Sequence, residues 1–322
     1  MGRLFGTDGV RGIANRDLSC ELAFKIGAVG AYVLTNEVHS PRILIGMDTR
    51  KSGPMLGAAL SAGVCSVGGD VLDVGILPTP AMAYLVRLYE ADAAVMISAS
   101  HNPMEYNGIK WFDKNGFKLS DEIEDRIESI IQSGEELPRP EGRDVGRVIA
   151  AVRAKKDYCD YLVEQSEYRF EGLRIVLDCA HGASSFIAKE VFERLGAEVI
   201  AKSCAPDGIN INDHCGSTHP ERLQEMVVNY GADLGFAFDG DADRLISCDE
   251  YGNIVDGDQA MGILALHMHS KGTLVKNTLV LTVMSNLGLK NALKEAGISI
   301  VETKVGDRYV LENMLANGYS IG

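Results

Sequence analysis

The sequence predicts an α/β protein of three consecutive, related βαβ-type domains, each a mixed or mostly parallel sheet covered by helices. Three observations favour this fold class. Short apolar runs alternate with segments of helical pattern, the order strand–helix–strand–helix–strand occurs twice and begins a third time, and polar turns with glycine separate the repeats. Because ligand-binding loops follow the carboxyl ends of parallel strands, we expect the domains to surround one central cleft.

The first domain contains three predicted strands. Residues 42–48 form an apolar strand, and a glycine turn and a small-residue helix through Ser66 follow it. The second strand is predicted at residues 70–74 and the third at residues 93–97. The third strand ends in the polar loop 98–103, which is therefore expected at the ligand-binding edge of the sheet.

The same order returns in the second and third domains. Strands are predicted at residues 173–178, 196–200 and 232–238, and then at residues 278–283 and 297–301. The loop after the third strand of the second domain occupies the same position as loop 98–103 of the first domain, which we call the serine loop. This equivalence indicates that both loops face the same cleft.

Composition indicates the domain boundaries. The stretch 133–144, with its prolines and glycines, is expected to be an exposed connection, and a polar turn near residues 249–258 is expected to precede the third domain. We therefore expect domains at residues 1–150, 151–252 and 253–322.

The final residues of the sequence indicate an incomplete third domain. Residues 318–321 begin what we expect to be its third strand. The loop equivalent to the serine loop would follow Gly322, so we expect this domain to be cut before that loop.

Length, charge and cysteine usage exclude several classes of protein. The chain of 322 residues is too long for one ordinary core, and no apolar run reaches the length of a membrane span. A net charge of −14 argues against nucleic acid or anionic membrane as a partner. Seven scattered cysteines without a Cys-x-x-Cys pair indicate reduced thiols and a cytoplasmic location.

The most informative stretch follows the strand at residues 232–238. Asp239, Asp241 and Asp243 alternate there with small residues, and Arg244 comes next. Three carboxylates in a tight turn repel one another unless a hard cation binds between them. The alternative is a solvated acidic turn.

This loop allows two other interpretations. A calcium loop of the EF-hand kind would place Glu250 at the twelfth position, but Arg244 stands where that loop needs glycine and the flanks indicate strands. A phosphatase of the haloacid dehalogenase type would use Asp239 as its nucleophile, and that alternative stays open.

Ser100 is the candidate nucleophile of the first domain. It lies in a small polar loop beside His101 and Asn102, and Pro103 stiffens the end of the loop. A serine in this position could carry a phosphoryl group whose charge a cation at the Asp239 loop would offset. The alternative is a serine that only caps a turn.

Cationic residues on polar loops are further candidates, although each could also be an ordinary surface residue. Arg11 lies in a glycine-dense loop, where its guanidinium suits a phosphate. Lys110 follows the serine loop and could be a general base or a phosphate contact. The third domain carries polar residues after its second strand, namely Lys304, Gly306, Asp307 and Arg308.

One cysteine and histidine cluster suggests zinc only weakly, because the spacing of Cys204, His214, Cys215 and His219 fits no standard finger. We expect Thr218 instead to cap a helix, with Glu221 completing a capping box.

Taken together, these motifs resemble the α-D-phosphohexomutase family, and closely its bacterial phosphoglucosamine mutase branch. Four segments carry the resemblance: the opening residues 3–12, the phosphoserine loop 97–103, the magnesium loop 239–244 and the sugar-proximal loop 304–308. The resemblance covers the whole chain. Members of the family continue into a sugar-contacting loop and a fourth domain, both of which we expect to be absent here.

The resemblance implies a mutase that interconverts glucosamine 6-phosphate and glucosamine 1-phosphate. Phospho-Ser100 would donate its phosphoryl group to this phosphosugar substrate, and a hexosamine bisphosphate would be the intermediate and activator. One Mg²⁺ per chain would bind Asp239, Asp241, Asp243 and the Ser100 oxygen.

The resemblance also implies supporting roles. Lys110 would transfer a proton, Arg11 would position phosphate, Arg244 would brace the magnesium loop, and His101 and Asn102 would adjoin the phosphoserine. The sugar would contact Lys304, Gly306, Asp307 and Arg308.

Other interpretations remain open. They are a phosphomannomutase or phosphoglucomutase of the same family, the aspartate phosphatase, and a non-catalytic fragment that binds Mg²⁺. A homodimer is compatible with the resemblance. Since both phosphates of an intermediate that turns over must be held, we expect impaired turnover from a chain without the fourth domain.

Overall fold

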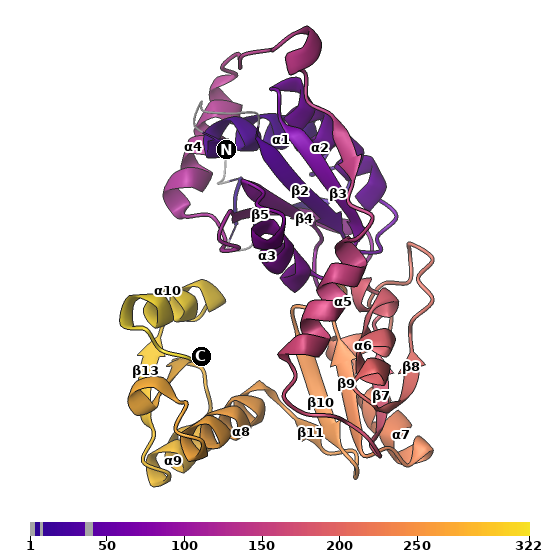
Figure 1. Ribbon diagram of the computed structural model, residues 1–322, viewed down its shortest axis with the longest axis vertical. Helices are drawn as coiled ribbons and strands as arrows, with labels where there is room; N and C mark the ends of the chain where they lie inside the picture. Colours follow the sequence, from indigo (N-terminus) through magenta and orange to yellow (C-terminus); the bar gives the residue numbers. More distant parts are fainter. Residues whose placement is uncertain (1–3, 7–8, 36–40) are drawn as a thin grey trace. The chain divides into compact units, whose positions relative to one another are not determined.

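The computed structural model describes residues 4–6, 9–35 and 41–322, so Arg3, Thr7 and Asp8 of the opening motif lie outside the described residues. The chain divides into two compact units, Met1–Asn253 and Ile254–Gly322 (Figure 1). The first unit contains two sheets with their helices.

The first sheet is mixed, in the strand order β1-β5-β4-β2-β3-β6. β4, β2, β3 and β6 are parallel to one another. β5 pairs antiparallel with both β4 and β1, so β1 runs in the same direction as the parallel strands. The elements of this part are β1 (Val10–Ile13), α1 (Cys20–Thr35), β2 (Arg42–Met47), α2 (Gly53–Ser66), β3 (Asp70–Ile76), α3 (Thr79–Leu88), β4 (Ala93–Ile97), β5 (Tyr106–Asp113), α4 (Asp121–Ser133), a 3₁₀ turn at Gly142–Asp144 and β6 (Val148–Ala150).

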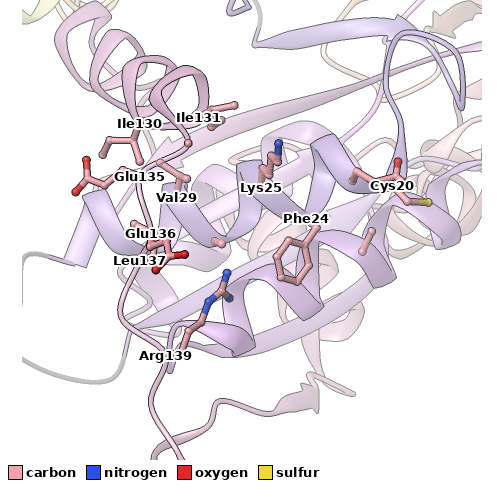
Figure 2. A pocket seen from close by; sticks show the side chains of 14 residues that line it. Cys20, Phe24, Lys25, Val29, Ile130, Ile131, Glu135, Glu136, Leu137 and Arg139 are labelled. Atoms are coloured by element: carbon pink, nitrogen blue, oxygen red, sulfur yellow. The ribbon is translucent and has the colours of Figure 1, made fainter.

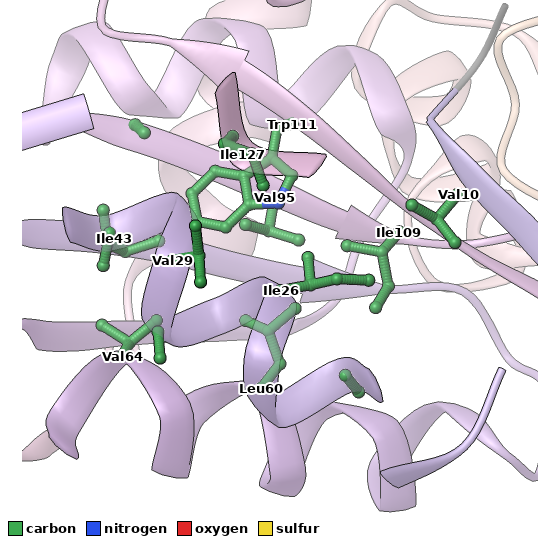
Figure 3. Close-up of a cluster of buried hydrophobic side chains, with 14 of the residues drawn as sticks. Val10, Ile26, Val29, Ile43, Leu60, Val64, Val95, Ile109, Trp111 and Ile127 are labelled. Carbon is green, nitrogen blue, oxygen red and sulfur yellow. The ribbon is translucent and has the colours of Figure 1, made fainter. Parts of the chain in front are cut away.

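Helices cover both faces of this sheet because its central strands are apolar on both sides. Ile43 and Ile45 of β2 face a core formed with α1, α2 and α4, whereas Leu44 between them faces α3 and α5 (Ala154–Gln165). Figure 3 shows the first core, where side chains of α1 and α2 pack against the sheet; the labelled residues are Val10, Ile26, Val29, Ile43, Leu60, Val64, Val95, Ile109, Trp111 and Ile127.

Glycines allow α1 and α2 to pack backbone against backbone. A Cβ atom on Gly27 would lie 2.3 Å from the carbonyl oxygen of Leu60, and one on Gly63 would lie 2.1 Å from that of Phe24. No side chain fits at either distance, so this helix pair requires glycine at both positions.

The second sheet has the order β10-β9-β7-β8 within the first unit. β9, β7 and β8 are parallel, and β10 pairs antiparallel with β9. After α5 its elements are β7 (Arg174–Asp178), a 3₁₀ turn at Ala183–Phe186, α6 (Ala188–Arg194), β8 (Glu198–Lys202), a 3₁₀ turn at Gly216–Thr218, α7 (Pro220–Tyr230), β9 (Leu234–Phe238) and β10 (Leu245–Asp249).

One detail of the second sheet differs from expectation. Thr218 belongs to a 3₁₀ turn, and α7 begins at Pro220 with His219 at the cap position and no side-chain capping bond. The predicted capping box is therefore wrong. The helix begins instead with proline at its first position, and proline has no backbone N–H that would need a hydrogen-bond partner.

The second unit contains the parallel strands β12 and β13, the short strand β11 and three helices. Its elements are β11 (Ile254–Val255), α8 (Gly257–Ser270), a 3₁₀ turn at Val275–Asn277, β12 (Thr278–Thr282), α9 (Leu287–Glu295), β13 (Ser299–Thr303) and α10 (Asp307–Asn317). The strand expected at residues 318–321 is not formed. The backbone N–H of Val280 nevertheless donates to the carbonyl oxygen of Ile321 at 3.2 Å.

The predicted fold class is confirmed, with mixed sheets and helices on their faces. The boundaries predicted near residues 150 and 252 stay predictions. Within the described residues, no helix combines the length and the apolar character needed to cross a membrane.

Candidate active site

Ser100 lies in the loop that follows the carboxyl end of β4, and β4 is an inner strand of the first sheet. Its side chain is buried and its backbone has φ +54°, the left-handed region that non-glycine residues rarely adopt. The backbone N–H of Ser100 donates to Ser98 Oγ at 2.9 Å, and the Ser98 hydroxyl donates to Asp48 Oδ2 at 2.7 Å. Buried hydrogen bonds thus hold the serine in an uncommon conformation.

Asp48 and Arg50 support this loop from the end of β2, and sequence reasoning missed both. Arg50 is 1% exposed and donates through Nε to Asp48 Oδ2 at 2.9 Å. Its two terminal nitrogens donate to the carbonyl oxygens of Pro103 at 2.5 Å, Ser100 at 2.9 Å and Asn102 at 2.8 Å. The position of Asp48 at a strand end was the available signal, since functional loops lie there.

The loop of residues 239–244, which we call the carboxylate loop, follows β9 at the corresponding edge of the second sheet. Asp239 and Asp241 are fully buried, whereas the Asp243 side chain is 34% exposed. One ligand atom from each of the three lies within 4.8 Å of the others, and no other such cluster of three His, Cys, Asp or Glu side chains occurs in the described ranges. The hydroxyl of Ser100 donates to Asp239 Oδ2 at 2.6 Å, so the serine and carboxylate loops meet.

Lys110 and Thr79 complete the polar surroundings of Asp241. Lys110, on β5, places Nζ 2.7 Å from Asp241 Oδ2 and 3.4 Å from Asp243 Oδ2. Thr79, the first residue of α3, donates through its hydroxyl to Asp241 Oδ2 at 2.6 Å. Thr79 was not among the sequence-predicted residues, because a threonine at a helix start is common without any function.

Crowding of the carboxylates separates their pKa values. Burial, together with Asp241 and Asp243, raises the pKa of Asp239 to about 7. Burial also acts to raise the pKa of Asp241, but Lys110 outweighs it, and the pKa is lowered. Asp241 is therefore charged at neutral pH, whereas Asp239 gains or loses its proton in that pH range.

The same contacts make Lys110 a cation. Burial acts to lower its pKa, but Asp241 and Asp243 outweigh burial and raise the pKa above its ordinary value. A lysine must lose its proton before it can accept one, and these carboxylates oppose that loss. The arrangement favours Lys110 as a contact for phosphate over Lys110 as a general base.

The donor set suits a hard divalent cation. Oδ1 of Asp241 is buried without a hydrogen-bond partner among the described residues, and the ligand atoms nearby are carboxylate oxygens. Mg²⁺ prefers oxygen ligands, and its charge would offset the repulsion that raises the pKa of Asp239.

Basic groups gather around Ser100 despite the acidic composition of the chain. His101 Nδ1 lies 3.4 Å from Ser100 Oγ, and burial, Arg244 and Arg11 lower the pKa of this histidine. A guanidinium nitrogen of Arg11 donates to Asn102 Oδ1 at 3.3 Å, and the backbone N–H of Arg244 donates to Asp239 Oδ1 at 3.2 Å. These groups offer a local site for an anion.

The remaining candidates lie elsewhere. Lys304, Gly306, Asp307 and Arg308 belong to the second unit, at the start of α10, and their role with a sugar stays a prediction. The zinc interpretation of residues 204–219 finds no support, since that segment contributes no ligand to a three-residue cluster within the described structure.

A separate hollow of about 830 Å³ lies between α1, α4 and the segment after α4 (Figure 2). Phe24, Val29 and Leu137 line it, and the Arg139 guanidinium lies 5.6 Å from the centre of the Phe24 ring. None of the candidate site residues lines this hollow.

Comparison with known proteins yields three family matches in chain order. The models describe phosphoglucomutase/phosphomannomutase α/β/α domains I, II and III and match residues 2–138, 156–252 and 256–322. A phosphoglucosamine mutase of Thermoanaerobacter sp. strain X514 is 59% identical over all 322 residues, which correspond to 72% of that relative.

Two solved structures share the fold. A phosphoglucomutase/phosphomannomutase family protein of Burkholderia thailandensis is 26% identical with a TM-score of 0.84, over 99% of this chain and 70% of the other. An N-acetylglucosamine-phosphate mutase, described as a member of the α-D-phosphohexomutase superfamily, is 16% identical with a TM-score of 0.56, over 99% of this chain and 66% of the other.

Proposed function

Because the chain belongs to the α-D-phosphohexomutase family, we propose that it acts as a phosphoglucosamine mutase, a phosphotransferase of the isomerase class. It would interconvert glucosamine 6-phosphate and glucosamine 1-phosphate. The observation that carries this proposal is the 2.6 Å hydrogen bond between the buried hydroxyl of Ser100 and Asp239 of the carboxylate cluster. The identity with a named phosphoglucosamine mutase supports this choice of sugar.

The proposed reaction moves one phosphoryl group in each half. In the first half, the bond between phosphorus and Ser100 Oγ breaks, a bond forms between phosphorus and a sugar hydroxyl oxygen, and the hydroxyl proton ends on Ser100 Oγ. The hexosamine bisphosphate then turns round. In the second half Ser100 Oγ takes the other phosphoryl group, and the proton passes to the sugar oxygen that is released.

Asp239, Asp241 and Asp243 would hold one Mg²⁺ together with the Ser100 oxygen. When bound, Mg²⁺ supplies positive charge that stabilises a transferring phosphoryl group. Phosphoserine at Ser100 is the second requirement of the proposal, and the same loop must accommodate both the free and the phosphorylated serine.

The chain's own residues would bind and orient the phosphoryl group. Lys110 and Arg11 would contact its oxygens, and His101 would lie beside Ser100. Arg244 would hold Asp239 through its backbone N–H, and Asn102 would position Arg11. In the second unit, Lys304, Gly306, Asp307 and Arg308 would contact the sugar.

A phosphosugar substrate and a cytoplasmic location belong to the same proposal. Basic groups around Ser100 support an anionic substrate. The seven cysteines are all free thiols, as proteins of reducing compartments usually have, which supports the location.

Phosphate mapping tests the proposal. The purified protein is incubated with MgCl₂ and a hexose 1,6-bisphosphate, and the site of the phosphate is found by mass spectrometry. We expect a hydroxylamine-stable phosphate on Ser100 that Ser100→Ala lacks. A hydroxylamine-sensitive phosphate on Asp239 would instead establish an aspartate phosphatase, and the absence of phosphate from both residues would contradict the mutase.

A further inference from the structure

We propose that Asn212 is a positioning residue that fixes the serine loop against the carboxylate loop. Asn212 lies in the segment between β8 and α7, within the stretch whose cysteines and histidines suggested zinc. Its consequence for phosphoryl transfer rests on the proposed function, whereas its consequence for the serine loop does not.

The side chain of Asn212 binds the serine loop directly. It is 8% exposed, and Nδ2 donates to the carbonyl oxygen of Ser100 at 2.9 Å and to that of Asn102 at 3.3 Å. An asparagine amide has two N–H groups, so it can serve both carbonyls at once. These bonds span about 110 positions of sequence and connect the loops of the two sheets.

Asn212 also lies against the carboxylate loop. A Cβ atom on Gly240 would be 2.9 Å from Asn212 Nδ2 and 2.7 Å from the carbonyl oxygen of Ser100. Real Cβ atoms do not come so close to other atoms, so glycine at 240 lets the two loops and this amide meet. Gly240 stands between Asp239 and Asp241, the two buried carboxylates of the candidate metal site.

The backbone holds the amide in place. Asn212 has φ +59°, a conformation that asparagine adopts more readily than most residues, and its N–H donates to the carbonyl oxygen of Ala180 at 2.9 Å. The carbonyl oxygen of Ser100 thereby receives two donors, Asn212 from the side of the second sheet and Arg50 from the side of the first. Two donors at one oxygen restrict the position of Ser100 more than either alone.

This arrangement has a consequence for the distance between Ser100 Oγ and Asp239. Arg50 and Asp48 fix the serine loop to its own sheet, but Asn212 is the described side chain that bonds this loop from the segment packed against Gly240. Without the amide, the serine loop would keep its hydrogen bonds to the residues after β2. Its position relative to the carboxylate loop after β9 would be less firmly fixed. A displacement of about 1 Å between reacting groups can cost on the order of 10²-fold in rate.

Two substitutions remove the contact. Asn212→Gly removes the side chain while tolerating the positive φ, and Asn212→Asp keeps the shape but cannot donate a hydrogen bond. Asn210→Gly is the matched control, since its amide donates to Ala205 in the same segment and contacts neither loop. If Asn212→Gly fails to fold, Asn212→Asp is measured in its place.

The first measurement is amide hydrogen exchange in the full chain without substrate or metal. The N–H groups of Ser100 and Asn102 are bonded within the serine loop. We expect their exchange to be about tenfold faster in Asn212→Gly and Asn212→Asp than in the parent, because a lost hydrogen bond lowers local stability. The control should exchange at these two positions as the parent does.

The second measurement is the rate of Ser100 phosphorylation by a hexose 1,6-bisphosphate at saturating concentration. We expect about a 10²-fold decrease in Asn212→Gly and little change in the control. Unchanged exchange at Ser100 and Asn102 in both Asn212 variants would overturn the inference, as would faster exchange with an unchanged rate. A parent protein that takes no phosphate on Ser100 would instead refute the proposed function, and the exchange result alone would then decide the role of Asn212.

Discussion

Asp239 changes charge near neutral pH because burial and two neighbouring carboxylates raise its pKa to about 7. The folded protein then binds a proton that the unfolded chain, with a pKa near 3.8, releases. Between these two pH values the metal-free protein loses stability as the pH rises, by about 4 kcal/mol at most. Mg²⁺ can bind only as this proton leaves.

We therefore predict that stabilisation by Mg²⁺ grows with pH. The difference in Tm between samples with MgCl₂ and with EDTA should be small near about pH 5 and should increase through about pH 7. Asp239→Asn should show a weaker dependence on pH in EDTA, because an amide does not titrate. Equal stabilisation at both ends of this range would contradict a metal site that includes Asp239.

Arg50 gives a second prediction at the scale of one residue. Arg50→Met would leave Asp48 buried without its cation, and it would remove one hydrogen-bond donor from each of three carbonyl oxygens of the serine loop. We expect a loss of about 3–5 kcal/mol in the free energy of unfolding, measured with urea. Arg50→Lys keeps the charge but not the five donors of the guanidinium, so it should restore only part of this loss.

Sequence reasoning found the residues of the site that are neighbours in sequence and missed those that are not. Asp239, Asp241 and Asp243 form a local pattern whose repulsion is evident from spacing alone. Arg50 and Asn212 act on Ser100 from 50 and 112 positions away, and an isolated arginine or asparagine in a polar segment has no local signature. Only the folded chain brings these donors to one carbonyl oxygen.

At the scale of elements, the parallel strands were predictable except for the short edge strand β6, and β5 was not. Runs such as Ala93–Ile97 are uniformly apolar because helices cover both faces of the sheet. β5 is also buried, but it contains Asn107, Gly108 and Lys110, which interrupt an apolar pattern. Lys110 is tolerated there because its ammonium group reaches Asp241, a partner in the loop that follows β9 of the other sheet.

The helix pair α1–α2 allows a prediction in which two effects oppose each other. Gly63→Ala should favour the helix by about 1 kcal/mol through intrinsic propensity. However, the new Cβ would lie 2.1 Å from the carbonyl oxygen of Phe24, so the helices must separate. We expect net destabilisation of about 1–3 kcal/mol, the usual cost of overpacking, in urea unfolding.

Gly57→Ala is the matched control on the same helix. Its Cβ would meet the end of the flexible Met47 side chain at 3.2 Å, which can move aside. This variant should be as stable as the parent or slightly more so. Equal effects at Gly57 and Gly63 would contradict the close packing of the two backbones.

At the scale of the whole molecule, the candidate site belongs to one compact unit. Ser100, Asp239, Asp241 and Lys110 all lie within Met1–Asn253, as do Arg50 and Asn212. The residues that the family resemblance connects with the sugar lie in Ile254–Gly322. Under the proposed function, metal binding and sugar recognition would therefore fall to different parts of the chain.

We predict that a fragment of residues 1–253 folds and binds Mg²⁺ as the whole chain does. Two buried cores of this unit pack against its own sheets, and all three carboxylates have their polar partners within it. Circular dichroism should show cooperative unfolding, and calorimetric titration should give a Kd for Mg²⁺ within about threefold of the full chain, since a difference of that size is less than 1 kcal/mol. Asp241→Asn in the fragment is the control and should weaken binding. If the folded fragment bound Mg²⁺ more than tenfold more weakly, residues beyond Asn253 would have to contribute to the metal site.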